Sequence, residues 1–489
     1  MENRKNKTLM TDYYELTMGQ TYYDLGMKDT IAYFDVFFRK IPLGGGYLAS
    51  GGLEETIDYI KNFRFTNKDI EYLRSRNQFS EEFLKYLKGL KFKGDIWAVP
   101  DGTMVFPDEP VLTVKADIIT AQILETALLV NFNAHSLVIT EAKRITNEAK
   151  GRPVMEFGAR RARGFDAAIE ASKDAIIGGC SGTSNTLAAM EYGITPLGTM
   201  AHSLVQFVGD EYEAFLAFAK SNPNNCVFLV DTYDVLRSGI PNAIRVADEY
   251  LTPNGLEFKG IRIDSGDLDY LSKEARKMLD AAGYPNAKIC ISNSLDEYAM
   301  KSLNEQGTPY DQTGNGERLI SANDRVCAVY KLVAVEEDGI PVPRIKVSED
   351  TGKIINPGYK KPIRFYDNET GYAIADVIKL YNEILPTEKY TLVHPTETWK
   401  TKEIKNYRMR ELLVPIFKKG KLVYKLPTVE ESRDYCQREF ETLYPETRRL
   451  ENPNKHIVDL TDELRELKEE LIRLHRKRVE PPKQYQKER

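Results

Sequence analysis

The sequence has few cysteines, and they are not spaced as metal-binding or redox pairs. There are five in 489 residues, with no CxxC pair among them: Cys180, Cys226, Cys290, Cys327 and Cys436. An odd number of widely separated cysteines argues against both a disulfide framework and a zinc site. Cys226 and Cys290 lie in apolar, strand-like runs, so we expect buried, reduced thiols rather than a catalytic thiol.

The sequence also lacks an excess of charge and long apolar runs. Its 68 basic and 73 acidic residues nearly cancel, so no overall attraction to nucleic acid or an anionic membrane is expected. No run approaches 18 uninterrupted apolar residues, and the first 19 residues contain no signal-peptide core. We therefore predict a cytoplasmic protein with no membrane or nucleic-acid partner, in which any anion site is built locally.

With 42% hydrophobic residues over this length, the chain can form two or three domains with a large core. We predict an N-terminal α+β domain over residues 1–150, an α/β domain over 151–340 and a C-terminal extension over 341–489. In the first, strand-like runs at 31–38, 94–106 and 110–118 precede a long apolar-periodic helix at 119–146.

Between residues 151 and 340, short apolar runs alternate with helical stretches. The strand candidates are 153–158, 174–179, 195–201, 225–233, 260–267, 287–294, 308–316 and 325–335. This alternation predicts βα units on a parallel sheet, and seven or eight units favour a barrel. An open, doubly wound sheet is the alternative. Both folds place ligands at the carboxyl ends of the strands.

The C-terminal extension is polar and rich in lysine. Residues 340–367 look like β-hairpins, and a helix near the end carries an amphipathic stripe of Leu464, Leu467, Leu471 and Leu474. We expect this helix to dock on the rest of the chain, because two heptads are too few for a stable coiled-coil surface.

The predicted strand ends carry glycine-rich turns, arginines and aspartates. The clearest are EFGARRARG (156–164), GGCSGTSN (178–185), RIDSGD (262–267) and TGNGE (313–317). Backbone N–H groups in such turns bind phosphate oxygens, arginine adds bidentate contacts, and carboxylates bind ribose hydroxyls or Mg²⁺. Singly, each could be a helix cap or surface charge. Together they predict a phosphorylated sugar substrate and a metal ion.

His202 follows the predicted strand in GTMAHS (198–203). A single histidine is usually structural, but this one lies on the same predicted rim as the arginines. There an imidazole could act as a base, a hydrogen-bond donor or a phosphate-accepting nucleophile. We expect the four other histidines, His135, His394, His456 and His475, to be structural.

Eight motifs, in order along the chain, resemble those of nicotinate phosphoribosyltransferases. They are LMTDYYELTMGQTYY, FFRKIPLGGGYL, EFGARRARG, GTSN, GTMAHS, DTYDVLRSGIPN, RIDSGDL and VYKLVAV. The resemblance implies an irregular α/β barrel of the type II phosphoribosyltransferases, with an α+β N-terminal domain and a C-terminal extension. It also implies an enzyme of NAD biosynthesis that makes nicotinate mononucleotide and pyrophosphate from nicotinate and 5-phosphoribosyl 1-pyrophosphate.

The resemblance further implies coupling to ATP hydrolysis through a phosphohistidine at His202, with Mg²⁺ near the catalytic carboxylates Asp264 or Asp267. It places Tyr14, Thr199 and Arg262 at nicotinate, and implies a homodimer with shared active sites, in which Tyr14 can serve the other subunit. Around the phosphoribosyl pyrophosphate it places Arg160, Gly182, Thr183, Ser184, Asp264, Asn293, Gly314 and Gly316. Glu317 stands where some members have threonine, and a carboxylate there would repel phosphate unless it points away or meets a metal ion.

Other functions stay open at this point. A nicotinamide phosphoribosyltransferase shares a similar DSGD turn, whereas quinolinate enzymes are much shorter. A catalytically silent metabolite-binding homologue is the alternative from a different class. A Schiff-base aldolase is disfavoured, because no lysine ends a predicted barrel strand.

Overall fold

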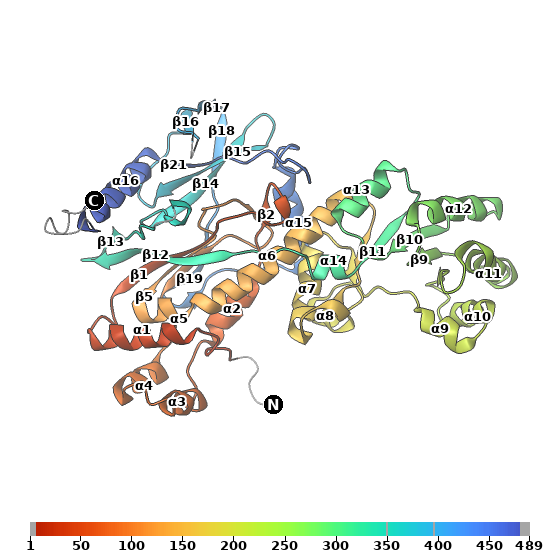
Figure 1. The fold of residues 1–489 in the computed structure, drawn as a ribbon, viewed down its shortest axis with the longest axis horizontal. Coiled ribbons are helices and arrows are strands. Elements are labelled where there is room, and N and C mark those ends of the chain that lie inside the picture. The colour runs from red at the N-terminus through yellow and green to blue at the C-terminus, as the bar shows by residue number, and fades with distance from the viewer. Residues whose placement is uncertain (1–5, 349–350, 395–396, 480–489) are drawn as a thin grey trace, which may run out of the picture. The chain divides into compact units, whose positions relative to one another are not determined.

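The computed structural model describes residues 6–348, 351–394 and 397–479 (Figure 1). The chain divides into two compact units. One comprises Met1–Ser136, Arg325–Leu426 and Arg438–Arg489, and the other comprises Leu137–Asp324 and Pro427–Gln437. The N-terminal and C-terminal parts, which the sequence predicts as separate domains, thus belong to the same unit.

A seven-stranded sheet joins these two parts of the first unit, in the order β13-β12-β1-β5-β3-β19-β20. Its strands are β1 (Ile31–Phe38), β3 (Asp95–Ala98), β5 (Leu112–Asp117), β12 (Ala328–Glu337), β13 (Ile340–Pro343), β19 (Val414–Lys418) and β20 (Lys421–Leu422). Every pair is antiparallel. The prediction that 325–335 forms a barrel strand is wrong. Seven of the eight β1 residues are buried, and β12 pairs along that strand with its own apolar residues.

Helices accompany this sheet, including two consecutive ones over the long helix predicted at 119–146. They are α1 (Tyr13–Asp24), α2 (Leu53–Asn62), α3 (Asn67–Arg74), α4 (Glu81–Gly89), α5 (Ile118–Ile123) and α6 (Glu125–Glu148). The stretch Ile118–Glu148 is long and apolar enough to cross a membrane, but 56% of its most apolar window is buried in the protein. Burial of this kind is typical of a core helix.

The C-terminal part adds a four-stranded sheet in the order β18-β14-β15-β21. Its strands are β14 (Lys360–Asp367), β15 (Ala373–Leu380), β18 (Tyr407–Glu411) and β21 (Val458–Leu460). The C-terminal part also contains the pair β16 (Lys389–Val393) and β17 (Thr401–Lys405). The pair β2 (Leu48–Ala49) and β4 (Met104–Val105) and the short helix η1 (Pro42–Gly44) belong to the N-terminal part. The two strands of the predicted 340–367 hairpin are not partners, because β13 pairs with β12 and β14 with β15.

The predicted C-terminal helix is α16 (Asp462–Val479), and it packs on β15. Its leucine stripe is only partly buried, since Leu464 is inaccessible whereas Leu474 is 46% exposed. The other helix of the extension is α15 (Val429–Glu441).

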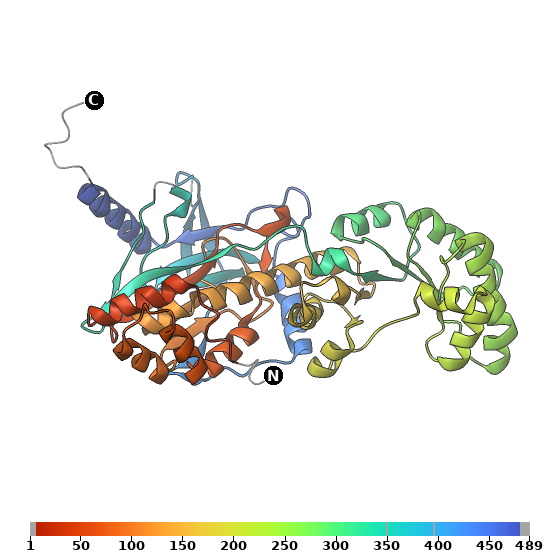
Figure 2. The ribbon, with the colours of Figure 1, turned by 60° about the horizontal axis from the view of Figure 1, so that its bottom comes forward.

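The second unit is built on a parallel sheet in the order β7-β6-β11-β10-β9-β8. Its strands are β6 (Val154–Glu156), β7 (Gly182–Thr183), β8 (Val227–Leu229), β9 (Gly260–Ile263), β10 (Lys288–Ser292) and β11 (Gln312–Asn315). The helices visible in yellow and green in Figure 2 are α7 (Phe165–Ile177), α8 (Thr186–Tyr192), α9 (His202–Val208), α10 (Glu211–Ser221), α11 (Ile240–Val246), α12 (Leu268–Ala281), α13 (Glu297–Glu305) and α14 (Glu317–Ile320). In β10, Ile289, Cys290 and Ile291 are completely buried although they point to alternate faces, as expected for a parallel sheet covered by helices.

The sheet continues past β7 toward an irregular barrel. Thr183 forms a parallel bridge with Pro196, and Asn225 Nδ2, just before β8, donates to the carbonyl of Gly198 at 2.9 Å. The strand predicted at 195–201 is thus absent except for this bridge at Pro196, and the segment 196–198 contacts residues at both edges of the sheet. The strand predicted at 174–179 is instead the end of α7 and its following turn, because its apolar residues continue the helical period of the preceding alanines.

Candidate active site

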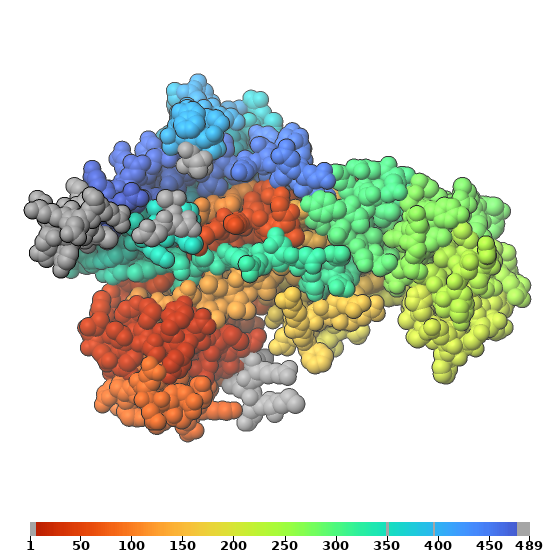
Figure 3. Space-filling model, in the orientation of Figure 1, coloured from red at the N-terminus to blue at the C-terminus, as the bar shows by residue number. Residues whose placement is uncertain are grey.

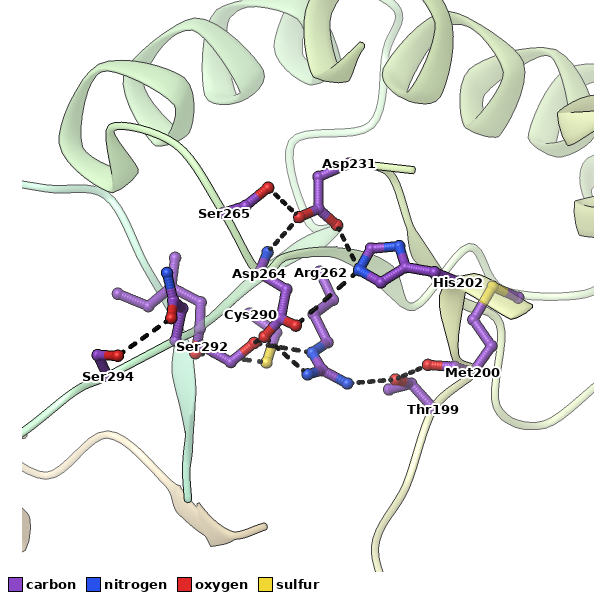
Figure 4. Close-up of polar contacts among 12 residues, drawn as sticks. Thr199, Met200, His202, Asp231, Arg262, Asp264, Ser265, Cys290, Ser292 and Ser294 are labelled. Carbon is purple, nitrogen blue, oxygen red and sulfur yellow. Dashed lines mark hydrogen bonds and ion pairs between the residues drawn. The ribbon is translucent and has the colours of Figure 1, made fainter. Parts of the chain in front are cut away.

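Polar side chains from four segments of the second unit meet at the carboxyl ends of its strands (Figure 4). Asp231 follows β8, Asp264 follows β9 and Ser292 ends β10. His202 is the first residue of α9, at the end of the 195–201 segment. Because these strands are parallel and adjacent, their carboxyl ends lie on one rim, as the alternation of strands and helices predicts.

His202 lies between a hydroxyl and two carboxylates. Its Nδ1 is 3.1 Å from Thr232 Oγ1, and its Nε2 is 3.7 Å from Asp231 Oδ1 and 4.0 Å from Asp264 Oδ2. The carboxylates favour the proton on Nε2, which leaves the Nδ1 lone pair to accept from the threonine hydroxyl. With 38% of the side chain exposed, the imidazole is oriented and also accessible.

Asp231 is a residue that the sequence reasoning missed. Its side chain is 1% exposed, and its Oδ2 accepts from the Asp264 N–H at 3.2 Å and from the Ser265 hydroxyl at 2.5 Å. Its Oδ1 is buried, has no hydrogen-bond partner in the described part of the chain, and faces His202. The available signal was its place at a strand end in VDTYD, equivalent to that of Asp264 in RIDSGD.

Arg262 connects three strand-end side chains. Its Nε donates to Ser292 Oγ at 2.9 Å, and its terminal nitrogens reach Asp264 Oδ1 at 2.9 Å and Thr199 Oγ1 at 3.4 Å. The structure thus brings together Arg262, Thr199 and Asp264, three of the predicted residues. Figure 4 shows them beside His202.

Phe157 is a second residue that sequence reasoning missed. The Arg262 guanidinium carbon lies 5.3 Å from the centre of the Phe157 ring, so a cation–π contact supports the arginine from the side. The same ring would lie 2.5 Å from a Cβ at Gly314. Gly314 therefore has to be glycine for the arginine and the ring to keep their positions.

The predicted phosphate turn 181–185 is held by a buried carboxylate. Thr183 Oγ1 donates to Glu156 Oε2, which also accepts from Ser172 at 3.1 Å, while the Asn185 N–H donates to Thr183 at 2.9 Å. Burial raises the pKa of Glu156. The Thr183 side chain is thus engaged in shaping the turn, which leaves the backbone and exposed Ser184 to face outward.

Close backbone contacts and positive φ angles also restrict which residues can stand at the turns on the rim. A Cβ at Gly182 would lie 2.6 Å from both Thr195 O and Leu197 Cδ1. Asn293 and Ser294 both adopt positive φ angles of 102° and 50° after β10, a region that asparagine tolerates better than most residues. Gly316 stands immediately before α14.

The remaining predicted residues of this unit lie farther from the cluster or have other partners. Arg160 is exposed in the turn Ala159–Arg161. Asp267 accepts from the Tyr270 N–H at 3.1 Å and so caps α12. Glu317 Oε2 lies 3.6 Å from Arg161 Nε, and both side chains are more than half exposed. The Glu317 carboxylate, which stands where some family members have threonine, is therefore paired with an arginine.

Tyr14 lies on α1 and belongs to the first unit, whereas the other predicted residues belong to the second unit. It is 47% exposed. Burial of its hydroxyl, with the charge of Glu125, raises its pKa, so the phenol stays neutral.

Four of the five thiols are buried, as expected, whereas Cys327 is exposed. Burial raises the pKa of Cys290 to about 12, so this thiol beside Arg262 is neutral at physiological pH and is not a nucleophile. His135 and His456 have almost inaccessible side chains, 3.5 Å from Glu55 and 3.4 Å from Asp376 respectively.

Within the described residues, no group of three or more His, Cys, Asp and Glu side chains is arranged to hold a metal ion. Mg²⁺ commonly takes only one or two protein carboxylates and completes its shell with water and substrate phosphates. The buried, unpaired Oδ1 of Asp231 and the neighbouring Asp264 fit that smaller role.

The fold and this rim define a barrel protein with an oriented histidine, a supported arginine and glycine-rich turns, a combination suited to a phosphorylated substrate and a small anion. The model of the nicotinate phosphoribosyltransferase family matches residues 153–315, and models of the N-terminal and C-terminal domains of nicotinate phosphoribosyltransferase match 9–133 and 359–468. The chain belongs to the nicotinate phosphoribosyltransferase family.

Individual relatives agree along nearly the whole chain. The nicotinate phosphoribosyltransferase of Bacillus subtilis is 42% identical over 97% of this chain and 96% of its own length. A nicotinate phosphoribosyltransferase of Mycobacterium tuberculosis is 40% identical over 91% of this chain and 89% of its own length. The crystal structure of human nicotinic acid phosphoribosyltransferase superposes with a TM-score of 0.82 at 29% identity, covering 94% of this chain and 99% of the human one. The predicted fold class, a type II phosphoribosyltransferase fold, is confirmed.

Proposed function

We propose that this enzyme joins nicotinate to 5-phosphoribosyl 1-pyrophosphate, giving nicotinate mononucleotide and pyrophosphate, in the synthesis of NAD. The observation that carries the proposal is the arrangement of Arg262, Thr199 and His202 on one rim, in a chain 42% identical to a nicotinate phosphoribosyltransferase. The Arg262 guanidinium is suited to pair with the nicotinate carboxylate, because arginine binds carboxylates through two parallel hydrogen bonds.

The transfer step needs no protein base. The pyridine nitrogen of nicotinate has a lone pair that attacks C1 of the ribose, while the bond from C1 to the pyrophosphate oxygen breaks. Positive charge develops on the ribose as the pyrophosphate leaves. The enzyme's part is to hold the two reactants in line and to support the charges. We assign Tyr14, Thr199 and Arg262 to nicotinate.

The phosphates are proposed to contact the turns and side chains around the rim. This set comprises Arg160, Gly182, Thr183, Ser184, Asn293, Gly314 and Gly316. Thr183 is assigned through its backbone, because its hydroxyl is bonded to Glu156. Bound Mg²⁺ would neutralise charge on the pyrophosphate, with Asp264 or Asp231 as the protein carboxylate; Asp267, the other sequence candidate, caps α12.

ATP is proposed to phosphorylate His202 at Nδ1. The Nδ1 lone pair gives up its hydrogen bond from Thr232 and attacks the γ-phosphorus, the bond to the ADP oxygen breaks, and the proton on Nε2 stays toward Asp231. Hydrolysis of the phosphohistidine then returns the imidazole and inorganic phosphate. The Nε2 distances of 3.7 and 4.0 Å to two carboxylates support this assignment, because these groups stabilise the cationic phosphoimidazole.

A homodimer with shared sites is proposed from exposed apolar side chains on the second unit. Phe165, Met190 and Phe207 on α7, α8 and α9 are 86%, 73% and 92% exposed. Large exposed apolar side chains on several helices are typical of an interaction surface. Light scattering on the purified chain tests this: the expected mass is twice 55.8 kDa, and a monomer under assay conditions contradicts it. A cytoplasmic location is proposed as well.

Substrate choice between nicotinate and nicotinamide tests the proposed function. With saturating phosphoribosyl pyrophosphate, ATP and Mg²⁺, we expect kcat/KM for nicotinate to exceed that for nicotinamide by about 100-fold or more, because an amide leaves the arginine charge unpaired. Chromatographic detection of the two mononucleotides measures this ratio. Equal or faster use of nicotinamide would identify a nicotinamide phosphoribosyltransferase. If neither substrate gave a mononucleotide, the chain would be a catalytically silent metabolite-binding homologue.

A further inference from the structure

The first unit contains a cavity of about 870 Å³, lined by both apolar and charged residues, that the proposed reaction does not use. Its wall combines η1 and the glycines Gly44–Gly46 with the turn Phe106–Asp108, residues of β15 and β21, and the start of α16. A cavity of this volume can hold a drug-sized or nucleotide-sized ligand. In Figure 3, orange-red atoms of the N-terminal part reach the surface between blue C-terminal residues and teal residues.

The lining of the cavity is strongly cationic. Four of the lining residues carry positive charge, namely Lys40, Lys455, Arg465 and Lys468, and the only acidic one is Asp108. Arg465 is already bound to Asp459 at 2.6 Å. The other three lysines have no carboxylate within ion-pairing distance among the described residues, and Lys468 bonds instead to the neutral Asn356 Oδ1 at 2.8 Å.

Lys468 is placed where its charge costs free energy. Burial lowers its pKa; Asp108 opposes the shift, and the positive charges of Lys360 and Arg465 add to it. Lys360 is itself paired with Asp35. An anion in the cavity would stabilise the charged form of Lys468.

Much of the rest of the lining is apolar, with Ile41, Ile354 and Leu460 among its residues. On one side, the φ of 61° at Gly44 favours glycine, and a Cβ at Gly46 would lie 2.1 Å from Thr447 O, so the backbone is bare at these two positions. On another side, the rings of Phe106 and His456 stack with centroids 4.0 Å apart. His456 is fixed from behind by Asp376, which is held by two bonds of 2.7 and 2.6 Å to Arg364.

We propose that this cavity binds a small molecule with a diphosphate or triphosphate group, whose phosphates contact Lys40, Lys455 and Lys468 beside the glycine backbone. Three lysines that are not matched by carboxylates suit a multiply charged anion better than a single carboxylate. Main-chain N–H groups in a glycine-rich turn are common partners of phosphate oxygens. The site belongs to the first unit and is independent of the transfer chemistry at the barrel rim.

Lysine acylation followed by mass spectrometry tests the proposal on the unmodified full chain. Burial lowers the pKa of Lys468, so this lysine reacts readily near neutral pH. A phosphate bound in the cavity would shield it and the exposed Lys40 and Lys455. We expect millimolar pyrophosphate or ATP to slow acylation of Lys40, Lys455 and Lys468 at least fivefold, and to leave exposed Lys421 unchanged. Protection by ATP alone would show that the base is also recognised. No protection by either probe would overturn the proposal.

Variants separate this site from the barrel rim. In Lys468→Met, we expect ATP and pyrophosphate no longer to protect Lys40 and Lys455 from acylation. In His202→Ala, we expect both ligands to protect these lysines as in wild type. Lys421→Gln is the matched control on the same unit and should behave like wild type. If His202→Ala removed the protection and Lys468→Met did not, the ligand would be bound through the barrel rim, and the cavity would not be a site.

Discussion

Replacement of His202 by alanine is expected to abolish transfer of labelled phosphate from γ-labelled ATP to the protein and to remove ATP-stimulated turnover. The side chain is accessible and oriented by Thr232, Asp231 and Asp264, and alanine has no group that can accept phosphate. We expect kcat/KM for nicotinate in the presence of ATP to fall by about 100-fold or more, the usual scale for loss of a group that takes part in the chemistry. Acid-labile phosphate and mononucleotide formation are the two measurements.

Two further variants test whether the loss of activity is specific to His202 and its partners. Asp231→Asn keeps the shape but weakens the partner of Nε2, so we expect slower phosphorylation with an unchanged unfolding temperature. His475→Gln, on α16, should be like wild type. If His202→Ala kept ATP-stimulated turnover, the histidine would be structural and the proposed coupling would be wrong.

Replacement of Arg262 by lysine is expected to raise KM for nicotinate about 30-fold to 150-fold, equivalent to about 2–3 kcal/mol for a charge-assisted contact. Lysine keeps the charge but loses the planar arrangement that contacts Ser292, Asp264 and Thr199 at once. It would also lose the stacked position beside Phe157. Steady-state kinetics with varied nicotinate measures the change.

Nicotinamide serves as the internal control for this variant. It has no carboxylate, so its slow turnover should change far less than that of nicotinate. Arg245→Lys, an exposed helix position paired with Glu249, should leave both substrates unaffected. An equal loss for nicotinate and nicotinamide in Arg262→Lys would mean that the arginine supports the rim and does not bind the carboxylate.

Much of the second unit follows from local pattern. Short apolar runs, each followed by a helical stretch, reflect backbone preference and burial that act over a few residues. That is enough to place β6, β8, β9, β10 and β11, and the polar residues that follow them. His202, Arg262 and Asp264 could be selected for the same reason, because parallel strands bring their ends to one rim.

Where local pattern was ambiguous, the prediction failed. The run 174–179 is apolar enough for a strand, but it continues the helical period of α7. The strand at 325–335 looks like a barrel strand, yet β12 pairs with β1, about 300 residues earlier in the chain. Strand pairing depends on which apolar faces meet. The residue pattern within one strand does not identify the strand with which it pairs.

The sequence by itself therefore determined the class of fold, the family, and the residue types that meet at the barrel rim. Only the tertiary structure decided that Asp231 turns a buried, unpaired oxygen toward His202, that Phe157 supports Arg262, and that Glu317 meets Arg161. It alone brings Lys40, Lys455 and Lys468 around one cavity. The reason is physical: local sequence sets backbone conformation and burial, whereas distances between charges distant in the chain are set by packing of the whole unit.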